Sequence, residues 1–214
     1  YVESDGRYGL ITGKTQMTLF TAEGLMRAVV RHQRGGDRDA VALVEHAYER
    51  WLDTQGEVPD RWHDRFELLW DPGWLIFVPQ LRARRRPGET CLAALRELPA
   101  GSVAEPVNNS KGCGGLLRVG PAGLILDPSW DLDRFELGRD IAAITHGHPS
   151  GYLAAGALAL IVDEIVCGGN TTAYAVDAAR VRLAREPGRE ETLAALDAAI
   201  ALAGDHRTPS AELV

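Results

Sequence analysis

Apolar residues recur at steps of three and four along most of this chain, and that spacing limits its possible folds more than any other feature. Within 15–32, for example, Met17 and Phe20 stand three apart, and Leu25 and Val29 stand four apart. Few stretches alternate with period two. The pattern therefore predicts an all-α fold, a compact multi-helix domain over 1–214. The expected helices are 15–32 with Thr15 as N-cap, a second through Leu52 capped by Asp37 or Asp39, then 60–71, 88–98, 132–145, 150–167, 171–185 and 189–203.

Composition and charge narrow the class of protein. With 45% hydrophobic residues and a net charge of −7, the chain matches a globular protein and not one whose whole surface grips nucleic acid. Its most apolar stretch, 153–166, is shorter than the roughly 20 residues that span a bilayer. Residues 1–9 carry no signal-peptide pattern, and three scattered cysteines indicate free thiols. We therefore expect a cytoplasmic protein with no membrane and no nucleic-acid partner.

One segment is too rich in glycine and proline for regular helix. Residues 105–123 hold five glycines and two prolines. Within them, the glycines of 109–115 permit positive φ and close approach of the backbone to a ligand, while Ser110 adds a hydroxyl and Lys111 a cation. These features suit a nest for a phosphate or diphosphate, although a plain Gly-rich turn fits the same pattern. The segment lacks the spacing of a Walker loop.

Two further segments carry polar residues at predicted helix ends. His146 and His148 stand two apart, before the predicted helix that Pro149 opens. With no further metal ligand to assign, we interpret them as structural or substrate-contacting. Lys14 lies beside the predicted start of the first helix, where the macrodipole disfavours a cation. Such a conflict between local preference and residue type is often found where function constrains the sequence.

Read in order, these segments resemble a known family. The chain contains ITGKTQMTLFTAEGLMRA, NNSKGCGGLLRVGPAGL, THGHPSGYLAAGALALIVDEIV and EPGREETLAALDAAIALA. They resemble the ADP-ribosylglycohydrolases, the family that includes the dinitrogenase reductase-activating glycohydrolase. The resemblance implies an all-α fold and hydrolytic removal of ADP-ribose from modified side chains. It also implies that the diphosphate and ribose contact, in this chain, Asn109, Ser110, Lys111, Gly112, Cys113, Gly114 and His146, with His148 a weaker candidate.

The chain departs from the family at its metal centre. The family holds two magnesium ions with a Thr-Asp-Asp run before the first long helix and a second acidic run from a late helix. Here the first run reads Thr12-Gly13-Lys14-Thr15, and the second run and the family's opening Gly-Asp-Ala segment are absent, so the domain looks truncated at both ends. Two unit charges about 4 Å apart interact by roughly 4 kcal/mol at an effective dielectric of 20, which disfavours a cation beside Lys14. We expect no metal and no other cofactor.

Three interpretations remain open. The first is a degenerate family member that keeps a pocket for ADP-ribose, or a related nucleotide sugar, without metal-dependent hydrolysis. An ADP-ribosylated protein would then be a further partner. The second is a repurposed, metal-independent enzyme in which Lys14 acts as electrostatic stabiliser, nucleophile or base, with Thr12 and Thr15 lining the former metal end. The third is a non-catalytic module for protein interactions.

Overall fold

The computed structural model describes residues 2–4, 7–36, 39–57, 73–97, 100–127 and 129–203. The helix predicted over 60–71 lies outside these residues. Within them every regular element except one short hairpin is a helix, which confirms the all-α prediction. The elements in order are β1 (Val2–Ser4), β2 (Arg7–Leu10), α1 (Gly13–Gln33), α2 (Ala40–Thr54), η2 (Leu75–Phe77), η3 (Pro79–Leu81), α4 (Glu89–Arg96), η4 (Leu116–Arg118), η5 (Gly120–Leu124), α5 (Arg134–Ala143), α6 (Pro149–Val166), α7 (Thr172–Leu183) and α8 (Glu190–Ala203), where η marks a 3-10 helix.

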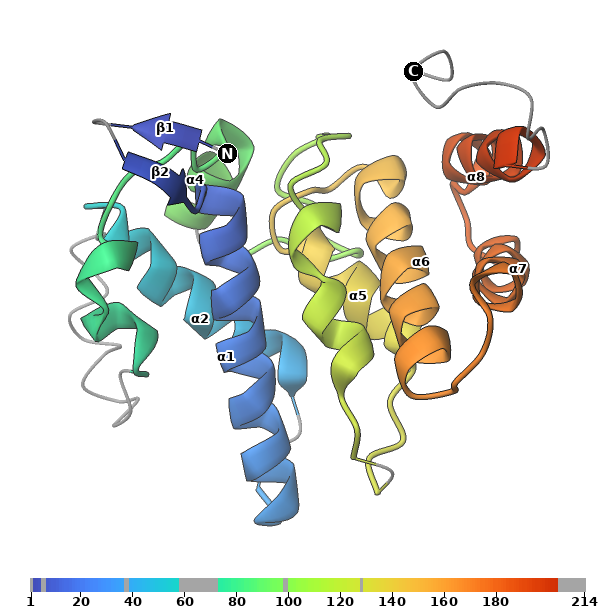
Figure 1. Ribbon diagram of the computed structural model, residues 1–214, viewed down its shortest axis with the longest axis horizontal. Coiled ribbons are helices and arrows are strands. Elements are labelled where there is room, and N and C mark those ends of the chain that lie inside the picture. The colour runs from blue at the N-terminus through green and yellow to red at the C-terminus, as the bar shows by residue number, and fades with distance from the viewer. Residues whose placement is uncertain are drawn as a thin grey trace.

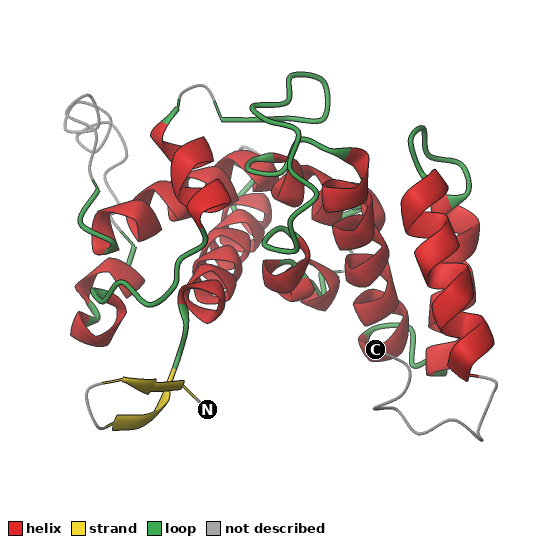
Figure 2. Ribbon diagram, turned by 90° about the horizontal axis from the view of Figure 1, so that it is seen from above, coloured by secondary structure: helices red, strands yellow, loops and turns green. Residues whose placement is uncertain are grey.

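The hairpin is the only regular element in the described residues that is not a helix. Strands β1 and β2 pair antiparallel, with Val2 opposite Leu10 and Ser4 opposite Arg7 (Figure 2). The residue pattern predicts only a polar terminus and a loop here. Strands of three and four residues are too short to show a period-two pattern, so the pairing leaves no clear signal in the sequence.

Helix starts follow the expected capping chemistry at some positions. The carboxylate of Asp39 accepts from the Ala42 backbone N at 2.9 Å, which confirms Asp39 as a cap of α2. The prediction for Thr15 is wrong, because α1 begins two residues earlier, with Thr12 at the N-cap position. No side chain caps α1 there. Instead the Gly13 N–H donates to the Arg85 carbonyl at 2.6 Å, a long-range bond that local sequence does not encode.

Two groups of helices pack around the 3-10 turns η4 and η5. Helix α1 packs on α2, α5 on α6 and α6 on α7, while η4 and η5 contact both α1 and α6 (Figure 1). The core between them is closed by large apolar side chains with no exposed surface, among them Phe20, Trp51, Phe135 and Leu153. This packing brings α1 and α6 into one body although more than a hundred residues separate them.

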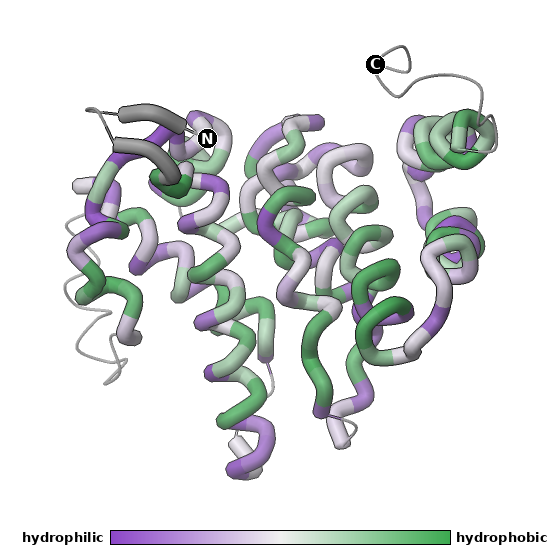
Figure 3. The backbone as a smooth tube through the Cα atoms, viewed as in Figure 1, coloured by the Kyte–Doolittle hydropathy of each residue, from purple (hydrophilic) through white to green (hydrophobic). Residues whose placement is uncertain are grey.

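Helix α6 is the one helix in the described ranges that is long and apolar enough to cross a membrane by length and composition (Figure 3). Its buried residues lie in its first two thirds, from Gly151 to Ala159. The helix contacts α5, η5 and α7. Such packing is typical of a core helix, the role that the sequence predicts for 153–166.

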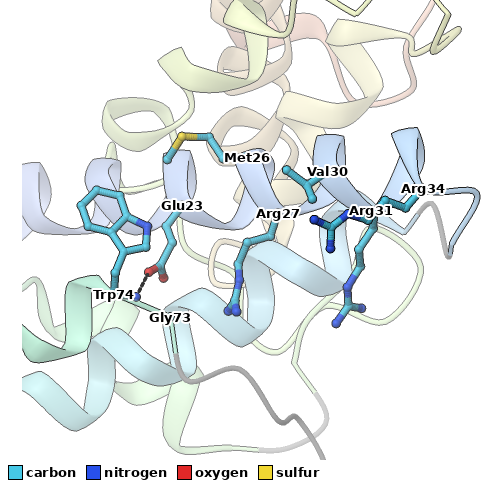
Figure 4. A pocket seen from close by; sticks show the side chains of 8 residues that line it. All are labelled: Glu23, Met26, Arg27, Val30, Arg31, Arg34, Gly73 and Trp74. Carbon is cyan, nitrogen blue, oxygen red and sulfur yellow. Dashed lines mark hydrogen bonds between the residues drawn. The ribbon is translucent and has the colours of Figure 1, made fainter.

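A buried ion pair links α1 to α2. The Glu23 carboxylate, which is 0% exposed, accepts from Arg50 Nη2 at 2.9 Å and Nε at 3.2 Å. Its other oxygen accepts from the backbone N–H groups of Trp74 at 2.8 Å and Leu75 at 3.1 Å (Figure 4). One carboxylate thus joins α1, α2 and the segment that leads into η2.

Beside Glu23 lies a groove of about 590 Å³. Arginines on one side of α1 and the indole of Trp74 line it (Figure 4). None of the residues that the sequence analysis selects lines this groove. The candidate site therefore lies elsewhere.

Candidate functional site

The three segments selected from the sequence meet at a different cavity, about 170 Å³ in volume. Helices α1 and α6 begin at the same end of the molecule, where the loop of residues 100–115 crosses between them (Figure 1). At that end Lys14 from α1, residues 112–114 of the Gly-rich loop, and His146 after α5 line one cavity. The wall is completed by Met17, Pro87, Gly88, Thr90 and Cys91.

The glycines of the loop serve close packing and not unusual backbone angles. None of Gly112, Gly114 and Gly115 has a positive φ, so the loop does not use the left-handed backbone angles that glycine permits. Instead, a Cβ on Gly114 would lie 2.9 Å from His146 Cε1 and 3.2 Å from Cys91 Sγ. A Cβ on Gly115 would lie 2.9 Å from Ala142 Cβ. Glycine is required here because the loop backbone lies directly against the imidazole and against α5.

This close packing predicts that even a methyl side chain at position 114 destabilises the fold. Gly114→Ala forces a methyl group against His146 and Cys91, and we expect the free energy of unfolding to fall by about 1–3 kcal/mol. Gly120→Ala is the matched control, because a Cβ there meets nothing within 4 Å. Its effect should stay below about 1 kcal/mol. Urea denaturation of both variants measures the difference, and equal effects would contradict the close approach.

A single asparagine links the Gly-rich loop to the histidine turn. Asn108 Nδ2 donates to the Thr145 carbonyl at 2.9 Å. Its Oδ1 accepts from Ser110 N at 3.0 Å and from Gly147 N at 3.1 Å. Asn108 is not among the predicted site residues, because two of its partners lie nearly 40 residues away and leave no local pattern. Its three bonds set the distance between the two segments.

His146 is held neutral at the base of the cavity. Its side chain is 1% exposed, and Nδ1 lies 2.8 Å from Thr145 Oγ1, while Nε2 faces Gly112 and Gly114. Burial, followed by the nearby charge of Arg118, lowers the His146 pKa from 6.5 to about 4. At neutral pH the ring therefore offers an uncharged Nε2 to a ligand in the cavity.

Arg118 is a second cation near the cavity, besides Lys14, and it is buried. Its side chain is 0% exposed; Nη1 donates to Met17 Sδ and Cys91 Sγ at 3.7 Å, and both of these residues line the cavity. Nη2 donates to the Ile141 carbonyl at 2.9 Å, and the guanidinium stacks 4.3 Å from the Tyr48 ring centroid. No carboxylate among the described residues pairs with it. Lys14 therefore lines the cavity, and the buried charge of Arg118 lies behind Met17 and Cys91 in its wall.

Lys111 is directed away from the cavity. Its ammonium binds both carboxylate oxygens of Glu191 on α8, at 2.6 and 2.8 Å. Glu191 also accepts from Ser150 Oγ at 2.6 Å. Lys111 does not line the cavity, although its neighbour Gly112 does. Lys111, the lysine predicted to bind phosphate, therefore lies outside the cavity that Gly112 and Gly114 line.

Several other predicted site residues lie outside the cavity lining. Ser110 Oγ accepts from Gly112 N at 3.2 Å and so shapes the loop, while Asn109 is exposed. His148 caps α6, with Nδ1 accepting from Ser150 N at 3.0 Å. Thr12 stands at the N-cap of α1, and Thr15 is exposed on the same helix. Of the predicted set, the cavity gathers Lys14, Gly112, Cys113, Gly114 and His146.

The donor groups of the cavity do not fit the pair of divalent ions that the resemblance implies. Magnesium prefers carboxylate and other oxygen ligands, and no Asp or Glu is among the cavity residues. Lys14 instead presents an ammonium at this end of α1. Across the described part of the chain, no group of three or more His, Cys, Asp or Glu side chains is placed to hold a metal.

Comparison with known proteins identifies the family. The model of the ADP-ribosylglycohydrolase family matches residues 1–214. Comparisons with curated proteins and with solved structures give no match. The family match covers every segment that forms the cavity and agrees with the helical fold. The chain therefore belongs to the ADP-ribosylglycohydrolase family.

Proposed function

We propose that this protein binds an ADP-ribose-like nucleotide sugar and does not carry out the metal-dependent hydrolysis implied by its family. One observation carries the proposal: Lys14, the Gly112–Gly114 backbone and His146 line one cavity. A lysine and loop amides favour a phosphate group, and the neutral His146 ring suits a ribose hydroxyl. An ADP-ribosylated protein that presents such a group is a further expected partner.

The size of the cavity sets how the ligand binds. Sites for whole small molecules measure about 300–1,000 Å³, whereas this cavity measures about 170 Å³. Only part of a nucleotide sugar enters, and the remainder lies over the exposed Gly112 and Cys113. The positive charges of Lys14 and Arg118 favour the anionic diphosphate as the part that enters.

The ammonium of Lys14 is the group to remove in a test of this proposal. Lys14→Ala should weaken ADP-ribose binding about tenfold or more, because a charge-assisted hydrogen bond is lost. Arg31→Ala, which removes the same charge from the same helix away from the cavity, should leave the affinity unchanged. Isothermal titration calorimetry measures both. Absence of ADP-ribose binding by the unaltered protein would refute the proposal.

Lys14 also supports a second candidate function, a metal-independent reaction in the same cavity. An ammonium that lines a cavity beside an uncharged imidazole can stabilise a developing negative charge. Release of ADP-ribose from an ADP-ribosylated protein, measured with and without EDTA, separates the two functions. Turnover that survives EDTA and disappears in Lys14→Ala would support the second function. Turnover that EDTA abolishes would refute both.

A further inference from the structure

Helix α8 lies at the edge of the molecule, where it contacts α6 and α7 (Figure 1). None of its residues is buried, and only Leu193 and Leu196 pack partly against the core. Gly188, with φ of +74°, turns the chain just before the helix. Farther along α8, Asp197 pairs with Arg180 of α7. In the first turn of α8, the polar side-chain contacts among the described residues are those of Glu191.

The Glu191 carboxylate occupies a set of donors that would suit a phosphate oxygen. It binds the Lys111 ammonium at 2.6 and 2.8 Å and the Ser150 hydroxyl at 2.6 Å. Ser150 lies in the first turn of α6, where the helix dipole favours an anion. These groups adjoin the Gly-rich loop, since Lys111 precedes Gly112 in the cavity wall. A carboxylate of the chain thus fills an anion position beside the ligand cavity.

We propose that Glu191 is a built-in competitor for the phosphate-binding groups of the site, so that ligand binding releases the first turn of α8. When a ligand phosphate reaches the cavity, Lys111 turns from Glu191 to the phosphate, and Ser150 loses its bond to the carboxylate. No covalent bond changes. We call this competition between Glu191 and a ligand phosphate the gate. It rests on the proposed binding of a phosphate-bearing ligand in the cavity.

The exposure of the pair leaves it open to competition from a ligand phosphate. The Lys111 side chain is 53% exposed and that of Glu191 is 58% exposed. Ion pairs at such positions contribute little to stability, because water and salt screen them. A diphosphate carries more charge and more acceptor oxygens than a carboxylate, so it should replace Glu191 as the partner of the Lys111 ammonium. The long lysine stem lets the ammonium move while the loop backbone stays in place.

Glu191→Gln tests the gate with ADP-ribose and inorganic diphosphate as probes. The variant keeps the size of the side chain and removes its charge, so both probes should bind about two- to fivefold more tightly. Glu190→Gln is the matched control, because Glu190 is exposed in the same turn and forms no ion pair with a described residue. In a Lys111→Ala background, the effect of Glu191→Gln should disappear. Calorimetry gives the affinities.

Amide hydrogen exchange supplies a second measurement. In the unaltered protein, saturating ADP-ribose should speed exchange at residues 190–194 as the first turn of α8 is released. Equal or weaker binding by Glu191→Gln, or slower exchange there, would overturn the gate while leaving the proposed function intact. Failure of ADP-ribose to bind any variant would refute the proposed function. The gate would survive that result only if inorganic diphosphate still bound Glu191→Gln more tightly than the unaltered protein.

Discussion

Glu23→Gln is expected to lower the free energy of unfolding by about 3–5 kcal/mol, because it removes one partner of a buried ion pair. The substitution keeps the shape of the side chain but takes away the negative charge that faces Arg50, which is 4% exposed. It also weakens the acceptor for the backbone N–H groups of Trp74 and Leu75. Desolvation of a charge is costly, and the interior offers little water to replace the lost partner.

The control for this prediction is an ion pair on the surface. Asp53→Asn breaks a pair with Arg82, whose side chain is 50% exposed, and should cost no more than about 1 kcal/mol. Urea denaturation at pH 7 measures both variants. If the two substitutions had similar effects, the Glu23 carboxylate would not be the junction of α1, α2 and η2 that the structure shows.

The buried imidazole of His146 should make the protein less stable in mild acid. Its pKa is about 4 in the folded chain, against an ordinary value of 6.5. Between those values the unfolded chain binds a proton that the folded chain does not, so stability falls as the pH falls from about 6.5 to 4. The gap corresponds to a loss of about 3 kcal/mol at most. At pH 7 and above this contribution is fully present.

Two measurements check this contribution. An NMR titration of the His146 ring protons should show no protonation above pH 5 and a midpoint near 4. His146→Gln removes the titrating group but keeps a hydrogen-bonding side chain, so its stability should fall less steeply between pH 6.5 and 4. A midpoint near 6.5 in the folded protein would contradict the buried, uncharged imidazole.

Part of this structure could be predicted because it depends on residues that lie close together in the sequence. Asp39 caps α2 as expected, since an N-cap depends on a side chain and a backbone N–H three residues away. The cavity likewise gathers Lys14, Gly114 and His146 from segments chosen by residue type. Each of these signals is contained within a few consecutive residues.

The remaining features depend on partners far along the chain. The start of α1 is set by the Arg85 carbonyl and not by Thr15. Lys111 fits a phosphate by residue type, yet Glu191, 80 residues later, takes its ammonium. The bonds of Asn108 to the histidine turn also cross a long separation in the sequence. Such contacts become visible only when the helices are packed.

Arg118 places beside the cavity a charge that lies out of reach of the solvent. Its guanidinium is stacked on Tyr48 and fully enclosed. Counterions from solution screen an enclosed charge far less than a surface charge. The contribution of Arg118 to the proposed anion binding should therefore persist in concentrated salt, where that of the exposed Lys14 fades.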